Sequence, residues 1–147
     1  MFGRIKGLPT VKLKSDYISG DKSANDNNGG YFGMNPQAGP ANLMSIHPNL
    51  IWNPAKDVTL TLDVVFNWRS SLEDGVYGPS GLLRLSSCGS AERYIGTAYM
   101  STFSWNINDY LGYNVGVQYF NTGSFINNVI PGHKDGLFVG SVIGFKF

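Results

Sequence analysis

The stretch 58-VTLTLDVVFNWR-69 alternates apolar and mostly polar side chains over its whole length. The even-numbered positions from Val58 to Trp68 are apolar, whereas the odd-numbered positions include Asp63 and Arg69. Such a period-two pattern predicts a β-strand with one apolar face. Its 12 residues are about twice the usual length of a strand in a soluble protein. A tilted strand needs about 9–11 residues to cross a bilayer, so the stretch predicts a membrane-spanning strand.

Five further segments follow the same pattern and place their larger apolar side chains on one face. They are residues 10–19, 45–53, 94–107, 111–120 and 137–147. Pro48 makes the second segment less regular, because proline cannot donate a hydrogen bond to a sheet ladder. Together the segments predict an all-β fold: an antiparallel transmembrane β-barrel meander with about six strands present, which is a partial barrel.

The connections between these segments alternate in length. Short turns are predicted at residues 53–57 and 107–110, and long links at residues 20–44, 70–93 and 121–136. Outer-membrane barrels have short periplasmic turns and long extracellular loops. We therefore expect the C-terminus and both short turns on the periplasmic side.

Composition excludes several classes of protein. The formal net charge is only +1, from 11 basic and 10 acidic residues, whereas a nucleic-acid binder needs a basic face. Aromatic residues make up 14% of the chain, which argues against disorder. Cys88 is alone, and His47 and His133 are expected on a strand and in a loop. We therefore expect no metal, no cofactor and no catalytic residue.

The two ends of the sequence give different information. Residues 1–9 form an N-terminal lead-in without the apolar region of a signal peptide, so we expect a fragment with a barrel domain over residues 10–147. Phe145 and Phe147 end the last alternating segment. This ending resembles the C-terminal signal by which the barrel-assembly machinery recognises bacterial outer-membrane proteins, which makes that machinery an expected partner.

Several short words occur in a specific order along the chain. They are YISGD at 17–21, NL at 42–43, HP at 47–48, WR at 68–69, YIG at 94–96, YFNTGSFI at 119–126 and FKF at 145–147. In this order they resemble the C-terminal part of the alginate-export porin family of Gram-negative outer membranes. The resemblance implies a barrel of about eighteen strands that passes an anionic uronic-acid polymer, such as alginate, or small anionic solutes through a charged lumen.

The alternation also predicts which side chains would line that lumen. They are Lys12, Lys14, Asp16, Asp63, Asn67, Arg69, Asn114, Gln118 and Lys146. Arg69 could bind a carboxylate through two hydrogen bonds, whereas the lysines would act as point charges. Alternatively, these residues form ion-pair networks that stiffen the wall.

Other interpretations remain open from the sequence alone. Six strands are fewer than the eight of the smallest bacterial barrels, so several chains could share one barrel. A soluble β-sandwich that binds carbohydrate through exposed aromatic residues is the main alternative function. An outer-membrane enzyme would need a catalytic cluster among Asp16, His47, Asp63 and Arg69.

Overall fold

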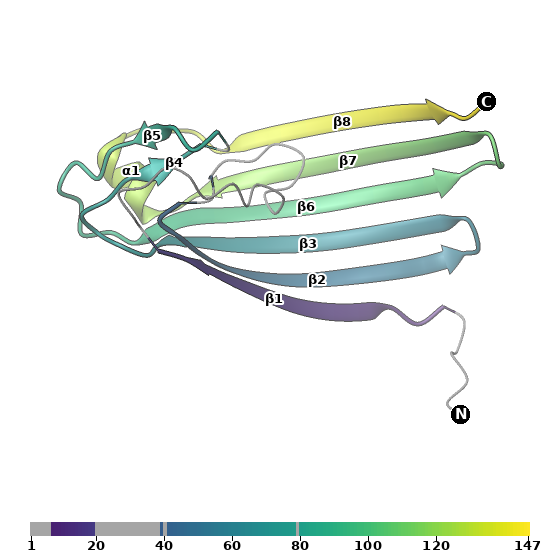
Figure 1. The fold of residues 1–147 in the computed structure, drawn as a ribbon, viewed down its shortest axis with the longest axis horizontal. Helices are drawn as coiled ribbons and strands as arrows, with labels where there is room; N and C mark the ends of the chain where they lie inside the picture. The colour runs from purple at the N-terminus through teal and green to yellow at the C-terminus, as the bar shows by residue number, and fades with distance from the viewer. Residues whose placement is uncertain (1–6, 20–38, 40, 79) are drawn as a thin grey trace.

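Six long strands form one antiparallel sheet in the computed structural model, which describes residues 7–19, 39, 41–78 and 80–147 (Figure 1). In spatial order they are β1 (Thr10–Ile18), β2 (Leu43–Ala55), β3 (Val58–Arg69), β6 (Tyr94–Asn106), β7 (Leu111–Thr122) and β8 (Gly136–Phe145). Each long strand pairs with the next long strand along the chain. The predicted all-β antiparallel meander is therefore confirmed.

The register of the strands sorts their side chains onto two faces. Asn49 on β2 pairs with Asp63 on β3, Asp63 pairs with Met100 on β6, and Met100 pairs with Gln118 on β7. Directly paired residues of neighbouring strands lie on the same face of a sheet. The alternation that each strand shows in sequence therefore becomes a property of the whole sheet.

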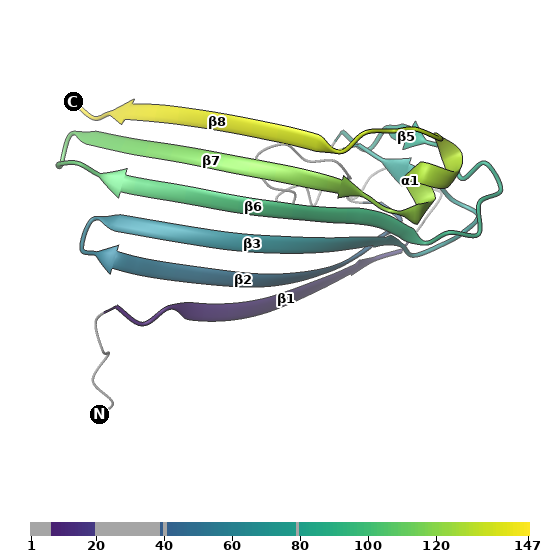
Figure 2. The ribbon, with the colours of Figure 1, turned by 180° about the vertical axis from the view of Figure 1, so that it is seen from behind.

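Both short turns lie at one end of the sheet, here called the turn end, and the links after β3 and β7 lie at the other, here called the loop end (Figures 1 and 2). The turn predicted at residues 53–57 contains fewer residues than expected. Strand β2 continues to Ala55, which pairs with Val58, so only Lys56 and Asp57 connect the strands. The register shifts between Trp52 and Ala55. Strand β2 therefore includes Asn53, Pro54 and Ala55, which were predicted to belong to the turn.

Two of the long links contain regular structure that the alternation did not predict. The link after β3 holds a small hairpin of β4 (Val76–Tyr77) and β5 (Leu83–Leu85). The link after β7 holds the helix α1 (Ser124–Val129). A six-residue helix is too short to be stable alone, and its buried residue, Phe125, packs in the apolar core. Tertiary packing therefore stabilises this helix.

The apolar core of the described residues is small and includes side chains from both links. It consists of Leu43, Val65, Val76, Ile95, Ala98, Phe120 and Phe125. The predicted link at 20–44 and the N-terminal lead-in lie mostly outside the described residues. Among the residues that are described, no helix has the length and hydropathy needed to cross a membrane.

Candidate functional site

One face of the sheet, here called the outer face, carries large apolar side chains that are exposed. Leu13 is 74% exposed and pairs with Pro48, and a second row on this face runs from Val64 through Tyr99 and Tyr119 to Leu137. Other exposed members of this face are Val11, Tyr17, Ile46, Trp52, Leu62, Trp105, Val117, Val139, Ile143 and Phe145. Soluble monomers rarely expose apolar surface this extensively, so the outer face suits a lipid environment.

Aromatic side chains lie at both ends of the outer face, and Tyr99 and Tyr119 stack between the ends with ring centroids 6.3 Å apart. Towards the loop end, the ring centroids of Trp68 and Tyr94 are 5.8 Å apart. Near the turn end, Trp105 pairs with Val58. Val58 and Trp68 bound about 33 Å of strand at about 3.3 Å per residue, and a tilt of about 40° reduces this to about 25 Å. That height matches the apolar band of outer-membrane barrels.

The opposite face, here called the inner face, buries polar side chains. The buried residues on it include Ser45, His47, Asn49, Asn67 and Gln118. Burying polar groups while exposing apolar ones reverses the arrangement of a soluble protein. It is the arrangement of a membrane barrel, whose interior is polar and whose exterior is apolar.

The register brings four of the predicted lumen residues together around one histidine. Lys14 pairs directly with His47, and Asp16 Oδ2 lies 3.5 Å from His47 Nε2. Lys12 shares a row with Asp63 through Asn49 on β2. This group, here called the His47 cluster, is made of Lys12, Lys14, Asp16, His47 and Asp63. Sequence reasoning left His47 out of the lumen set, although it alternates with the apolar residues of its strand.

Asn67 is buried beside Ser45 and shares a row with Asp16 through it, so it borders the His47 cluster. The other predicted lumen residues lie farther away, and Gln118 is buried on β7. Asn114 lies nearer the turn end, and exposed Lys146 follows β8. The sheet therefore spreads these groups along the strands and does not gather them into one site.

Arg69, the last residue of β3, contacts both of the described long links. It is fully buried, and its guanidinium donates to the carbonyls of Leu72, Asp74, Ser90 and Glu92 at 2.5–3.1 Å. Its Cζ lies 3.9 Å from the ring centroid of Phe125. The guanidinium therefore holds the link between β3 and β6 against helix α1, and its donors are used on the protein's own backbone.

Two loop carboxylates, those of Asp74 and Asp135, also accept hydrogen bonds that stabilise the loop end. Asp135 accepts hydrogen bonds from the Tyr119 hydroxyl at 2.5 Å and the Thr122 backbone N–H at 2.8 Å. These bonds, led by the Thr122 N–H, hold the pKa of Asp135 well below its usual range. The hydrogen bond from Tyr77 to Asp74, at 2.8 Å, raises the pKa of the Tyr77 phenol. Both carboxylates accordingly act as structural acceptors.

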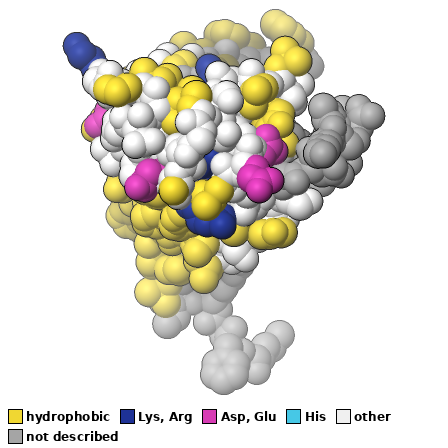
Figure 3. Space-filling view, turned by 90° about the vertical axis from the view of Figure 1, so that its left-hand side faces the viewer, with side chains coloured by type: hydrophobic (Ala, Val, Ile, Leu, Met, Phe, Trp, Pro, Cys, Tyr) yellow, Lys and Arg dark blue, Asp and Glu magenta, His cyan; other side chains and the backbone are white. Residues whose placement is uncertain are grey.

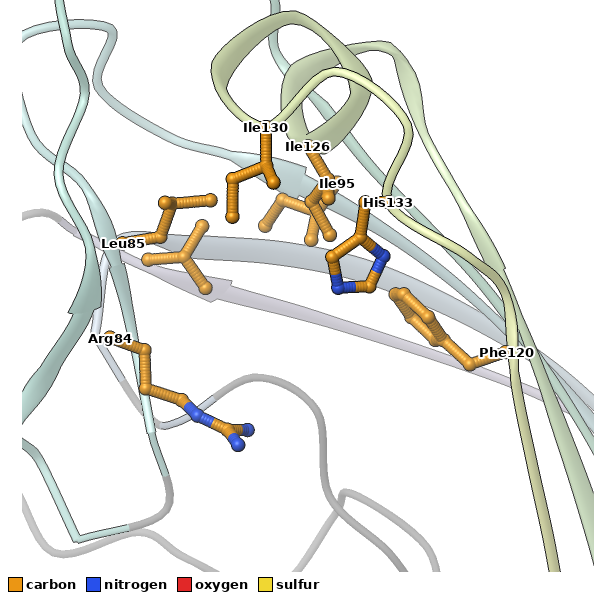
Figure 4. Close-up of a pocket in the computed structure, with 8 residues that line it drawn as sticks. Arg84, Leu85, Ile95, Phe120, Ile126, Ile130 and His133 are labelled. Atoms are coloured by element: carbon orange, nitrogen blue, oxygen red, sulfur yellow. The ribbon is translucent and has the colours of Figure 1, made fainter.

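Figure 3 looks onto this loop end, where acidic and basic side chains lie among mostly uncharged polar surface and apolar side chains gather below them. Behind that surface a cavity of about 180 Å³ lies between α1 and the β4–β5 hairpin. The His133 ring enters it near Phe120, and Arg84 lines its other side (Figure 4). Most of the residues that line the cavity are apolar, and Arg84 and His133 are the charged or titratable ones among them.

The described residues contain no group of three or more His, Cys, Asp or Glu side chains that could hold a metal ion. Their large sheet has no second large sheet beside it, since the only other sheet among the described residues is the two-stranded β4–β5 hairpin, which disfavours the β-sandwich alternative. The apolar exterior, polar interior and long strands define a wall segment of an outer-membrane β-barrel.

Within that class the family is shown by sequence comparison. The family described as alginate export matches residues 1–139, so the chain belongs to the alginate-export family and the resemblance read from the sequence is confirmed. No curated protein and no solved structure matches the chain. The family assigns an outer-membrane, porin-type role in alginate export, and it is a family of transporters.

Proposed function

We propose that the inner face of this sheet forms part of the wall of a channel that passes an anionic polysaccharide such as alginate, or small anionic solutes. The observation that carries the proposal is the inverted burial of the sheet, with polar side chains inside and apolar side chains outside. Lys12 and Lys14 are exposed on β1 of the inner face. They offer the positive charge that carboxylates of a passing polymer would meet.

Such a channel requires a closed wall. Among the described residues, β1 pairs with β2 alone and β8 with β7 alone, which leaves one free edge on each. Unpaired backbone groups cost several kcal/mol each in hydrocarbon. Further strands must therefore pair with β1 and β8 in the membrane, whichever chain supplies them.

We propose that different parts of the sheet contact different partners. The outer face would contact membrane lipid, and the exposed Phe145 and Phe147 would present the terminal signal to the barrel-assembly machinery. The Arg69 guanidinium, in contrast, would position loops at the channel mouth. We propose that Asp16 and Asp63 balance the lysines, so that an anion passes without being trapped.

The test uses the full chain purified in detergent and reconstituted into planar bilayers. We expect a conductance that selects anions over cations and that falls when an oligomer of uronic acids is added. Replacing both Lys12 and Lys14 with Gln should reduce the anion selectivity, whereas Lys56→Gln, in a turn outside the inner face, should not. Recovery of the chain in the soluble fraction without detergent, or a cation-selective conductance, would refute the proposal.

A further inference from the structure

His47 lies on the inner face between charged side chains of both neighbouring strands. Its Nε2 is 3.5 Å from Asp16 Oδ2 of β1 and 2.9 Å from Ser45 Oγ of its own strand. Lys14 of β1 and Asp63 of β3 are the other charged groups that act on the ring electrostatically. The histidine therefore sits between two carboxylates and one ammonium group.

The surroundings of the ring can respond to a proton. Imidazole is the side chain whose ordinary titration falls between about pH 5 and 8. Asp16 Oδ2 and Asp63 Oδ1 are buried and make no hydrogen bond to the described residues, so an imidazolium would give both carboxylates a positive neighbour. His47 is only 3% exposed, whereas the Asp16 side chain as a whole is 31% exposed.

Protonation changes the charge of the cluster as a whole. With a neutral imidazole, the formal charges of the two lysines and the two aspartates cancel. An imidazolium leaves one net positive charge on this part of the inner face. Lys12 and Lys14 are exposed there, so the added charge lies behind the two ammonium groups that an anion would contact.

We propose that His47, Asp16 and Asp63 form a proton-binding site on the inner face, and that its protonation strengthens the binding of an anionic polysaccharide beside Lys12 and Lys14. The inference rests on the proposed function, because it concerns how the same face regulates its cargo. One extra charge about 8 Å from a bound carboxylate, at an effective dielectric constant of about 40, strengthens binding about fivefold. Uronate carboxylates stay ionised over the pH range concerned.

The experiment measures binding of a hexameric uronic-acid oligosaccharide to the full chain in detergent micelles at pH 5.5 and 7.5, with neutral maltohexaose as the ligand control. We expect the uronate to bind about fivefold more tightly to the wild-type chain at pH 5.5. His47→Gln should remove this difference, and His133→Gln, which alters an exposed loop imidazole, should keep it. Binding that is independent of pH in the wild-type chain, or still pH-dependent in H47Q, would overturn the inference.

A second measurement separates this inference from the proposed function. The chain has two histidines, so proton NMR can follow both imidazole rings against pH, with H133Q providing the assignment. We expect the titration curve of the His47 ring to differ between the wild-type chain and each of D16N and D63N. Absence of uronate binding at both pH values would refute the proposed function. A His47 ring that titrates identically in the wild-type chain, D16N and D63N would refute the proton site.

Discussion

Replacing Arg69 with Met tests whether the buried guanidinium holds the loop end together. Met preserves much of the side-chain volume against Phe125 but removes all donors. Four carbonyls, those of Leu72, Asp74, Ser90 and Glu92, lose their hydrogen bonds, at about 1 kcal/mol each.

The cation–π contact with Phe125, at 3.9 Å, contributes about 1–2 kcal/mol more. Relief of the desolvation of the guanidinium offsets part of the loss. We therefore expect the loop between β3 and β6 to open about 3 kcal/mol more easily in R69M, while the six-stranded sheet persists.

Native-state hydrogen exchange of the backbone amides of residues 70–93 measures this opening. A loss of about 3 kcal/mol should raise their exchange rates about 100-fold. Arg93→Met is the matched control, since Arg93 is exposed and donates to the carbonyls of Arg69 and Ser70 at 3.2 and 2.7 Å. It should raise the rates less than tenfold. Unchanged exchange in R69M, or an equal effect in R93M, would refute the structural role of the guanidinium.

Three further predictions concern the two faces and the ends of the sheet. Leu62→Arg on the outer face should reduce the free energy of unfolding from lipid vesicles by about 2–4 kcal/mol. Thr61→Arg on the inner face should reduce it far less. Equal urea midpoints for the two variants would contradict the assigned faces. Because its hydrogen bonds depress the pKa of Asp135, they stabilise the loop above the ordinary Asp pKa, and that stability is lost as pH falls through the depressed value. The Thr122 amide resonance should therefore keep its position down to about pH 4 in the wild-type chain and be displaced at every pH in D135N, and an unshifted resonance in D135N would contradict the bond. Deleting Phe147 should lower the yield of folded protein in the outer membrane without changing folding in detergent, whereas an unchanged membrane yield would contradict a terminal signal.

The strand assignments show how much the sequence predicted. All six long strands lie within a few residues of the segments that alternation identified, because each spans the membrane and its two faces meet different solvents. The tight turn within residues 53–57 was predicted, but the extension of β2 to Ala55 and the helix at Ser124–Val129 were not. The first accompanies a register shift between Trp52 and Ala55, burial of Phe125 supports the second, and neither leaves a periodic signal.

The candidate site shows the complementary limit. Alternation placed Lys12, Lys14, Asp16 and Asp63 on one face, but the register alone set His47 between the aspartates. Arg69 shares the same parity, yet at the end of its strand it is covered by two links and binds backbone carbonyls. The odd or even position of a residue in its strand predicts which face its side chain occupies, but it does not predict what covers that face.

By itself, therefore, the sequence determined the fold class, the approximate positions of the long strands, the two faces and the family of this protein. These features follow from local alternation and from the contrast between lipid and water. Only the tertiary structure decided which inner-face charges meet and which cation is buried in the loop end, because both depend on strand register and on packing between links far apart in sequence.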